Sequence, residues 1–219
     1  MNKEDPKKEL LLCVFERLLK AYGKRNWWPA ESPLEVMIGC ILTQNTAWKN
    51  VEKAIANMKK KNLIDLHALR SIDVGELSEV IRPVGFYTLK AKRLKALVDF
   101  LFDEFKGDLE LMKRMDQHTL RKRLLGVDGV GPETADSILL YALEKPIFVV
   151  DAYTRRFLIN HGLFDGRAKY ERIQAFFMSN LPEDTYIYNE FHALIVYLGQ
   201  KHCRKVPICK GCPLESGKT

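Results

Sequence analysis

The chain has 219 residues, of which 47% are hydrophobic and 29% charged, and 35 Lys and Arg against 28 Asp and Glu give a formal net charge of +7. Glycine and proline number only 13 and 9, so this balance excludes collagen-like, low-complexity and disordered chains. The length allows one large domain or two small ones. The positive charge favours a polyanionic partner, although charge alone is weak evidence.

No apolar run approaches the ~18 residues of a membrane span, and the start, MNKEDPKKELLLCVFERL, lacks the apolar core and cleavage site of a signal peptide. We therefore expect no membrane partner. Of the five cysteines, Cys13 and Cys40 lie in apolar stretches and the others lie near the C-terminus. This distribution favours a reducing compartment over a disulfide framework. The expected location is cytoplasmic and, in a prokaryote, nucleoid-associated.

Helical periodicity dominates the chain. Residues 8–22 place Leu11, Phe15 and Leu18 on one stripe, with lysines and glutamates on the opposite face. Similar patterns, separated by short turn signals, predict helices at about 33–42, 46–60, 65–69, 74–81, 87–105, 108–113, 117–125, 132–143, 152–161, 167–179 and 187–201. Only PIFVV at 146–150 has the pattern of a strand, and five residues cannot form a sheet alone. The sequence therefore predicts an all-α fold.

Residues 117–143 hold the most informative pattern. An amphipathic helix ends at about Leu125, the turn G-V-D-G-V-G follows, and a second helix begins with Pro132 at its first position. Gly129 and Gly131 are expected to permit positive φ and close approach of another backbone. N–H groups at the start of the second helix can hold a phosphate, which predicts a helix-hairpin-helix that clamps a nucleic-acid backbone. An ordinary corner between two helices is the alternative.

Asp151 follows the apolar run 147–150 and precedes a helical segment. That placement is typical of an N-cap. A carboxylate behind an apolar wall is equally well placed to act on a reacting centre in a dry pocket. From the residues alone, both interpretations stay open.

Four motifs, taken together and in chain order, resemble the endonuclease III superfamily of DNA glycosylases, and the resemblance covers residues 30 to 214. They correspond to the family's early helix with its strand-wedging loop, its G-x-Y-x-x-K-A motif, its hairpin followed by a V-D pair, and part of its iron–sulfur loop. In this chain they read MIGCILTQNT at 37–46, VGFYTLKAKRL at 84–94, LLGVDGVGPETAD at 124–136 with Val150-Asp151, and CKGCPL at 209–214.

The resemblance implies two helical subdomains with an active-site cleft between them. One comprises residues 1–30 and 144–219 and carries the catalytic carboxylate and the cysteine loop, and the other comprises residues 31–143. The implied activity is base excision: a monomer binds double-stranded DNA containing a damaged base, flips the nucleotide out and cleaves its N-glycosidic bond. Asp151 matches the carboxylate that stabilises the oxocarbenium-like sugar or activates water. DNA contacts are implied at Gln44, Asn45, Gly129, Val130, Gly131 and Thr134.

Glu133 departs from part of the superfamily. Bifunctional relatives carry a lysine at this position, which forms a Schiff base with the sugar, and a carboxylate cannot form an imine. The substitution therefore predicts a monofunctional glycosylase that uses water as its nucleophile and has no lysine-dependent lyase activity.

All three tryptophans lie in two places, Trp27-Trp28-Pro29 and Trp48. Aromatic faces stack on any base, and a cationic base gains about 0.5–2 kcal/mol more through cation–π attraction. In DNA, 3-methyladenine is such a cationic base, and its glycosidic bond is already weakened. With Glu133, these aromatics resemble the 3-methyladenine glycosylase branch and are the expected base pocket. The alternative is that the tryptophans pack the core.

Two features depart from that branch. It carries a lysine in its last helix near the pocket, whereas the helix at about 187–201 has Leu194 and Gln200 at the matching places. His192 in this helix is a candidate for the pocket, although a lone histidine on an apolar helix is more often a hydrogen-bonded core residue. The branch also lacks an iron–sulfur loop.

The cysteine loop is incomplete. The superfamily pattern C-x₆-C-x₂-C-x₅-C holds a [4Fe–4S] cluster through four thiolates. Cys203, Cys209 and Cys212 supply three, position 218 is a lysine, and His202 restores only the first spacing. We expect a degenerate site whose loop still folds and presents basic residues to phosphate, with no cofactor required for chemistry. A cluster with a non-cysteine ligand and a zinc site are the alternatives.

The sequence therefore predicts a monofunctional DNA glycosylase for an alkylated purine such as 3-methyladenine. The enzymatic alternatives are a mismatch or deaminated-base glycosylase acting on uracil, thymine or adenine, and a bifunctional glycosylase/AP lyase. A non-enzymatic alternative is a DNA-binding module that has lost catalysis, and the presence of Asp151 argues against it.

Overall fold

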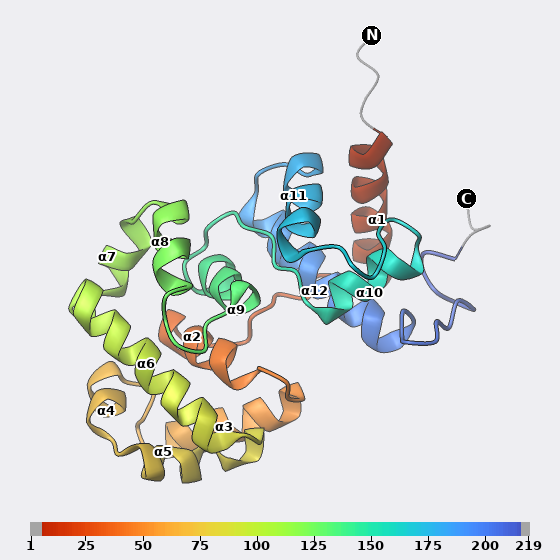
Figure 1. Cartoon of the computed structure of the whole chain (residues 1–219). Helices are drawn as coiled ribbons and strands as arrows, with labels where there is room; N and C mark the ends of the chain where they lie inside the picture. Colours follow the sequence, from red (N-terminus) through yellow and green to blue (C-terminus); the bar gives the residue numbers. More distant parts are fainter. Residues whose placement is uncertain (1–5, 216–219) are drawn as a thin grey trace. The chain divides into compact units, whose positions relative to one another are not determined.

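The computed structural model describes residues 6–215, and the chain divides into two compact units. Unit 1 consists of Met1–Trp27 and Lys145–Thr219, and unit 2 consists of Trp28–Glu144. The sequence placed the corresponding boundaries after residues 30 and 143. Within residues 6–215 the regular secondary structure is entirely helical, which confirms the all-α fold (Figure 1).

Unit 2 is built around one buried helix. Ser32 caps α2 by accepting a hydrogen bond from Glu35 N, and Pro33 occupies its first turn. The helix is apolar on nearly all sides, so it is buried from Leu34 to Leu42, and it packs against α3, α6, α9 and η2. The helices of unit 2 are α2 (Pro33–Leu42), α3 (Trp48–Lys60), α4 (Leu66–Ser71), α5 (Val74–Val80), η1 (Arg82–Val84), α6 (Tyr87–Phe105), α7 (Leu109–Arg114), α8 (Gln117–Leu124), α9 (Pro132–Ser137) and η2 (Ile138–Ala142).

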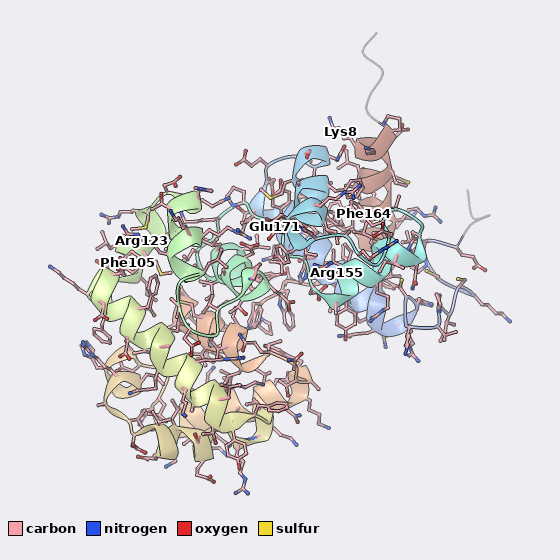
Figure 2. All side chains as sticks on the ribbon, in the orientation of Figure 1. Lys8, Phe105, Arg123, Arg155, Phe164 and Glu171 are labelled. Atoms are coloured by element: carbon pink, nitrogen blue, oxygen red, sulfur yellow. The ribbon has the colours of Figure 1, made fainter. Side chains whose placement is uncertain are left out.

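The longest helix of unit 2, α6, shows how the pattern sets the packing. Its buried residues recur at helical spacing from Lys90 to Phe105, which is fully buried. Near the end of α6 the charged side chains are exposed. One of them, Glu104, pairs with Arg123 of α8 (Figure 2). The helix ends at Phe105, and its C-cap Lys106 adopts the left-handed backbone common after a helix C-terminus.

Unit 1 contains α1 (Pro6–Tyr22), α10 (Ala152–Asn160), α11 (Tyr170–Asn180) and α12 (Thr185–Lys201). The helix α12 packs against α1 and α10. An aromatic cluster fills the core, in which Phe148 stacks on Phe177 with ring centroids 4.0 Å apart and both rings meet Phe191 edge-on.

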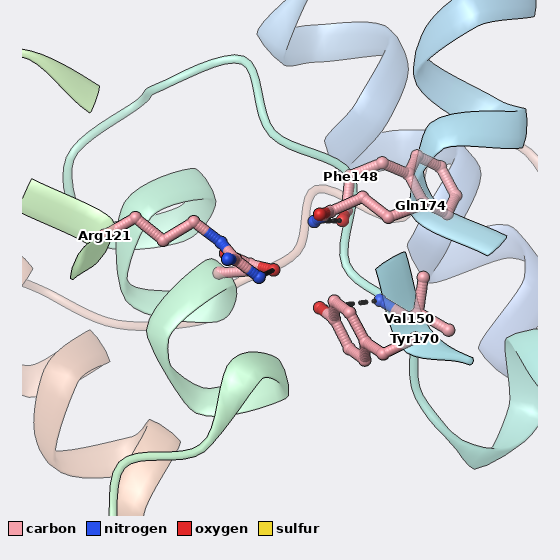
Figure 3. Close-up of polar contacts among 6 residues, drawn as sticks. Arg121, Phe148, Val150, Tyr170 and Gln174 are labelled. Atoms are coloured by element: carbon pink, nitrogen blue, oxygen red, sulfur yellow. Dashed lines mark hydrogen bonds and ion pairs between the residues drawn. The ribbon is translucent and has the colours of Figure 1, made fainter. Parts of the chain in front are cut away.

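The strand predicted at 146–150 is wrong. Two side chains of α11 take the backbone groups that a neighbouring strand would have paired: Gln174 Nε2 donates to Phe148 O at 2.7 Å, and Val150 N donates to the hydroxyl of Tyr170 at 3.3 Å (Figure 3). The apolar side chains of 147–150 are buried, as they would be in a strand. An extended segment that is buried without a partner strand therefore has the same sequence pattern as a strand.

None of the helices in the described part of the chain has the length and apolar character that crossing a bilayer requires.

Candidate functional site

The hairpin of unit 2 joins α8 to α9. Gly129 has a φ of +77°, as expected for a glycine that turns the chain. Gly131 has a φ of −89°, so it does not adopt the positive φ that a glycine permits. Gly131 is the N-cap of α9 and takes the extended backbone typical of that position. The space beside it is open, because an added Cβ would meet no atom within 4 Å.

Two backbone donors of this turn have no hydrogen-bond acceptor in the described part of the chain. Within residues 6–215 the N–H groups of Gly129 and Gly131 have no acceptor, whereas Val130 N donates to Val127 O at 3.0 Å. The side chain of Val130 is buried. The hairpin therefore offers two glycine amides, which suit an anion such as a phosphate, and Val130 supports the turn from beneath.

A buried ion pair fixes the two hairpin helices to each other. Arg121 on α8 donates from Nε to Oδ1 of Asp136 at 2.6 Å and from Nη2 to Oδ2 at 3.0 Å (Figure 3). Asp136 is fully buried on α9. Because a bidentate pair sets orientation as well as distance, this contact determines how the hairpin is presented.

Glu133 lies in the first turn of α9 with its side chain exposed. A carboxylate there interacts favourably with the helix dipole. Burial raises the pKa of the Cys40 thiol on α2, and the charge of Glu133 raises it further. The position at which the resemblance expects a lysine therefore carries a negative charge beside α2.

The predicted wedging loop follows α2, and its two polar residues have different surroundings. Gln44 Nε2 donates to Gly129 O at 2.9 Å and to Thr134 Oγ1 at 3.0 Å, which ties the loop to the hairpin. Thr134 itself is buried. Asn45 is exposed with a φ of +51°. Of the predicted pair, Asn45 is the exposed one.

Phe86, at the start of α6, is a candidate that the sequence analysis did not single out. Its side chain is 73% exposed, and its backbone has a φ of +46°. Positive φ is unusual for a bulky residue and persists only where the surrounding structure imposes it. The matched motif G-F-Y marked the position, but only coordinates show that the ring is exposed.

Trp28 and Trp48 meet in unit 2. Their ring centroids are 5.3 Å apart with the rings nearly perpendicular, and Trp28 also contacts Tyr141 at 5.4 Å. With Pro29 they line a pocket of about 210 Å³ beside α2 and α3. An added Cβ at Gly39 would lie 2.9 Å from Trp28, so this glycine lets the indole pack on α2. Trp28 therefore both packs the core and lines a pocket.

Two carboxylates share this pocket. Glu52 Oε1 accepts the indole N–H of Trp48 at 3.0 Å. Glu35 is buried and pairs with Lys59 at 3.0 Å, so its charge is balanced. In the described part of the chain Glu52 has no such cation. An aromatic wall with an unbalanced carboxylate favours a cationic guest.

Trp27 belongs to unit 1 and does not line this pocket. The chain just before it is held by Glu190, a buried carboxylate on α12 that accepts from Arg25 N at 2.7 Å and from Asn26 N at 2.6 Å. The four predicted pocket residues are thus divided, with Trp28, Pro29 and Trp48 together and Trp27 in the other unit.

Asp151 is the N-cap of α10, as its position in the sequence indicates. Its Oδ1 accepts from Thr154 N at 2.7 Å. Its Oδ2 lies 3.6 Å from Nε2 of His192, which is buried on α12 against Phe148. His192 is therefore a core residue, as its apolar helix favours, and it adjoins the carboxylate.

The surroundings keep Asp151 ionised. Burial raises the pKa of this carboxyl, but His192 and the hydrogen bond from Thr154 outweigh burial and bring the pKa below its usual value. A carboxylate with a low pKa is a poor general base at neutral pH and a permanent negative charge. The geometry thus favours electrostatic stabilisation of a developing cation.

The cysteine loop does not fit the cluster that the resemblance implies. Cys203 and Cys212 are buried and Cys209 is exposed, and no group of three His, Cys, Asp or Glu side chains among residues 6–215 is arranged to hold a metal ion. Asn160 Nδ2 donates to Cys203 Sγ at 3.3 Å. Lys218, at the fourth position, lies outside the described residues. Three thiols are one too few for a four-thiolate cluster.

Polar contacts hold this loop instead. Arg156 Nε donates to Cys203 O at 2.7 Å, and Arg17 Nε donates to Pro213 O at 3.0 Å. His202 Nδ1 lies 3.1 Å from Ile208 O. The basic residues of the loop are exposed: Lys201, Arg204 and Lys205.

Residues 38–183 match the HhH-GPD superfamily of base excision DNA repair proteins. The chain belongs to this superfamily. It is 49% identical to MJ1434 of Methanocaldococcus jannaschii, provisionally named a DNA repair glycosylase, over 97% of each protein. It is 26% identical to endonuclease III of Sulfolobus acidocaldarius over 82% of this chain and 78% of that protein. The protein is a DNA glycosylase of base excision repair.

Solved structures give the same fold. The 3-methyladenine DNA glycosylase MagIII of H. pylori, bound to 1,N6-ethenoadenine, superimposes with a TM-score of 0.76 and 30% identity over 89% of this chain and 97% of that one. An endonuclease III trapped as a covalent intermediate with DNA superimposes with a TM-score of 0.80 and 22% identity over 94% and 93%. The second likeness supports the fold alone.

Proposed function

We propose that this HhH-GPD glycosylase is monofunctional and releases an alkylated purine, such as 3-methyladenine, from double-stranded DNA. The observation that carries the substrate class is the pocket in which Trp28 and Trp48 meet the unbalanced carboxylate of Glu52. A cationic base gains from both the ring faces and the negative charge. MagIII, a 3-methyladenine DNA glycosylase, is among the structural relatives and supports this choice.

The proposed reaction is hydrolysis at the anomeric carbon. The bond to the base breaks, water adds a hydroxyl group to the sugar, and the water's second proton goes to solvent. A base that is cationic in DNA leaves as a neutral molecule, so its departure needs no protonating acid. The ionised Asp151 stabilises the positive charge that develops on the sugar.

Glu133 supports the monofunctional assignment, because no amine occupies the position that forms an imine in bifunctional relatives. The hairpin amides would bind a phosphate on either side of the lesion, and the exposed Asn45 and Phe86 would enter the stack as the nucleotide leaves it. We propose a monomer that needs no metal or cluster for this chemistry.

The experiment is a panel of duplexes that each contain one defined lesion: 3-methyladenine, 7-methylguanine, 1,N6-ethenoadenine, a G·U pair and a G·T pair. Base release and strand cleavage are measured separately, with and without borohydride. We expect release of the methylated purines, abasic sites that are cut only by later alkali, and no trapped adduct. Preferred release from G·U or G·T would assign the enzyme to mismatches, and a trapped adduct would show a bifunctional mechanism.

A further inference from the structure

Lys90 is a buried cation in unit 2. Its side chain is 2% exposed on α6, and its Nζ donates to Leu42 O at 2.8 Å and to Val84 O at 3.1 Å. Leu42 ends α2 just before the loop that carries Asn45, and Val84 ends η1 two residues before Phe86. One ammonium group therefore joins the bases of the two turns that present exposed side chains.

Arg93 lies three residues further along α6 and extends the same connection. Its Nη1 donates to Gln44 Oε1 at 2.6 Å, and Gln44 in turn donates to Gly129 O. The stem of Arg93 also crosses the hairpin, since a Cβ added at Gly129 would lie 2.3 Å from Arg93 Cγ. Glycine at this position is required by a close approach as well as by its φ.

One face of α6 thus connects three separate surface segments: the loop with Asn45, the turn with Phe86 and the hairpin with Gly129. All three residues have positive φ, at +51°, +46° and +77°. A non-glycine residue in that region is strained and keeps this conformation only where its surroundings hold it. Lys90 and Arg93 provide hydrogen bonds that can hold these conformations.

We propose that Lys90 and Arg93 are positioning residues for nucleotide extrusion, because they present the Asn45 loop, the Phe86 turn and the hairpin to DNA as one preformed surface. This inference rests on the proposed function. In this role they contact neither the base nor the sugar. Loss of either residue slows the insertion of Asn45 and Phe86 into the duplex. Misplacement of these side chains by about 1 Å is enough to lower the rate by a large factor.

A purely stabilising role is the competing explanation, and the chain provides a matched control for it. Lys95, on the same helix, donates from Nζ to Leu69 O, Arg70 O and Ile72 O at 2.9, 2.6 and 3.0 Å. It caps the end of α4, a helix that carries none of the three surface segments. Lys95→Met therefore removes three hydrogen bonds between a lysine of α6 and backbone carbonyls, and it leaves the contacts of Lys90 and Arg93 in place.

The experiment uses a duplex that contains a tetrahydrofuran abasic-site analogue opposite 2-aminopurine, whose fluorescence rises when a side chain enters the stack. Stopped-flow traces are recorded for wild type, Lys90→Met and Lys95→Met, with thermal melting of each. We expect both variants to melt at lower temperature and only Lys90→Met to slow insertion, by about tenfold or more. Insertion at the same rate in both variants would overturn the proposal.

Arg93→Met provides a second test, because Arg93 is partly exposed and tolerates substitution better than a buried lysine. Its control is Lys92→Met, which removes one charge from an exposed neighbouring position. Both variants should bind DNA more weakly at low salt, and only Arg93→Met should slow insertion. Equal insertion rates would contradict the proposal even if Lys90→Met fails to fold.

The probe contains no damaged base, so the two hypotheses fail separately. A wild-type enzyme that inserts normally but releases no methylated purine would overturn the proposed substrate and leave the positioning result intact. A wild-type enzyme that releases methylated purines, with Lys90→Met and Arg93→Met inserting as fast as their controls, would overturn the positioning role alone.

Discussion

The two units position their functional groups in opposite ways. Unit 1 presents one carboxylate, Asp151, on a segment held by packed rings and by two side chains of α11. Unit 2 presents two exposed side chains and the hairpin amides on three turns, held by buried polar contacts such as those of Lys90 and of Arg121 with Asp136. A single charge depends on the identity of one side chain, whereas a surface made of three turns depends on the conformation of many residues.

Because unit 1 depends on a single charge, Asp151→Asn should have the largest effect on the rate of base release. The amide keeps the shape and the N-cap, but it removes the charge that stabilises the sugar cation. Base release should fall by about 10²-fold or more. Single-turnover rates on a methylated-purine duplex measure the loss, and affinity for an abasic-site duplex should stay close to wild type. Near-normal turnover would remove Asp151 from the chemistry.

Glu52→Gln tests the substrate pocket within unit 2. It preserves an acceptor for Trp48 but removes the unbalanced charge, so release of cationic 3-methyladenine should fall about tenfold relative to neutral 1,N6-ethenoadenine. Trp48→Leu should lower the same ratio by removing a ring worth about 1–3 kcal/mol of stacking. Thermal melting serves as the control. A pure packing role predicts lower stability with an unchanged ratio between the two bases.

The two hairpin glycines should respond differently to alanine. Gly129→Ala forces a Cβ into the left-handed region and into Arg93, so it should reduce the free energy of unfolding by about 1–2 kcal/mol or more. Gly131→Ala meets open space and a permitted φ, so it should leave stability nearly unchanged and weaken binding to all duplexes alike. Urea unfolding and affinity titrations with and without a lesion separate the two effects. Equal stability losses would contradict this assignment of the turn.

A pH dependence of stability is also expected from Lys90, and it appears only in alkaline solution. Burial, together with the charge of Arg93, lowers the pKa of this amine to about 8. Between about pH 8 and pH 10.5, the ordinary pKa of a lysine, the unfolded chain binds a proton that the folded chain has lost, so stability should rise with pH across this window. The rise should be about 1–3 kcal/mol in wild type and absent in Lys90→Met. Denaturant unfolding at pH 7.5, 9 and 10 measures it.

Some of the site could be predicted from local sequence and some could not. The helices, the Gly129 turn and the cap formed by Asp151 follow from periodicity and from backbone preferences, which act over a few residues. The strand at 146–150 was wrong, because the local pattern was compatible with two outcomes and contacts from α11 selected the other one. Gly131 permits a positive φ but does not adopt one, because it is the N-cap of α9.

By itself, the sequence determined the all-α fold, the hairpin, membership of the superfamily and the absence of a lysine at Glu133, because each depends on residue type at fixed spacing. Only the tertiary structure decided that His192 adjoins Asp151, that Trp28 and Trp48 share a pocket with Glu52 while Trp27 does not, and that Lys90 connects two distant turns. These contacts join residues from 4 to more than 40 positions apart. The sequence alone does not distinguish a buried lysine from an exposed one. Packing, rather than local preference, brings such groups together and sets their charge.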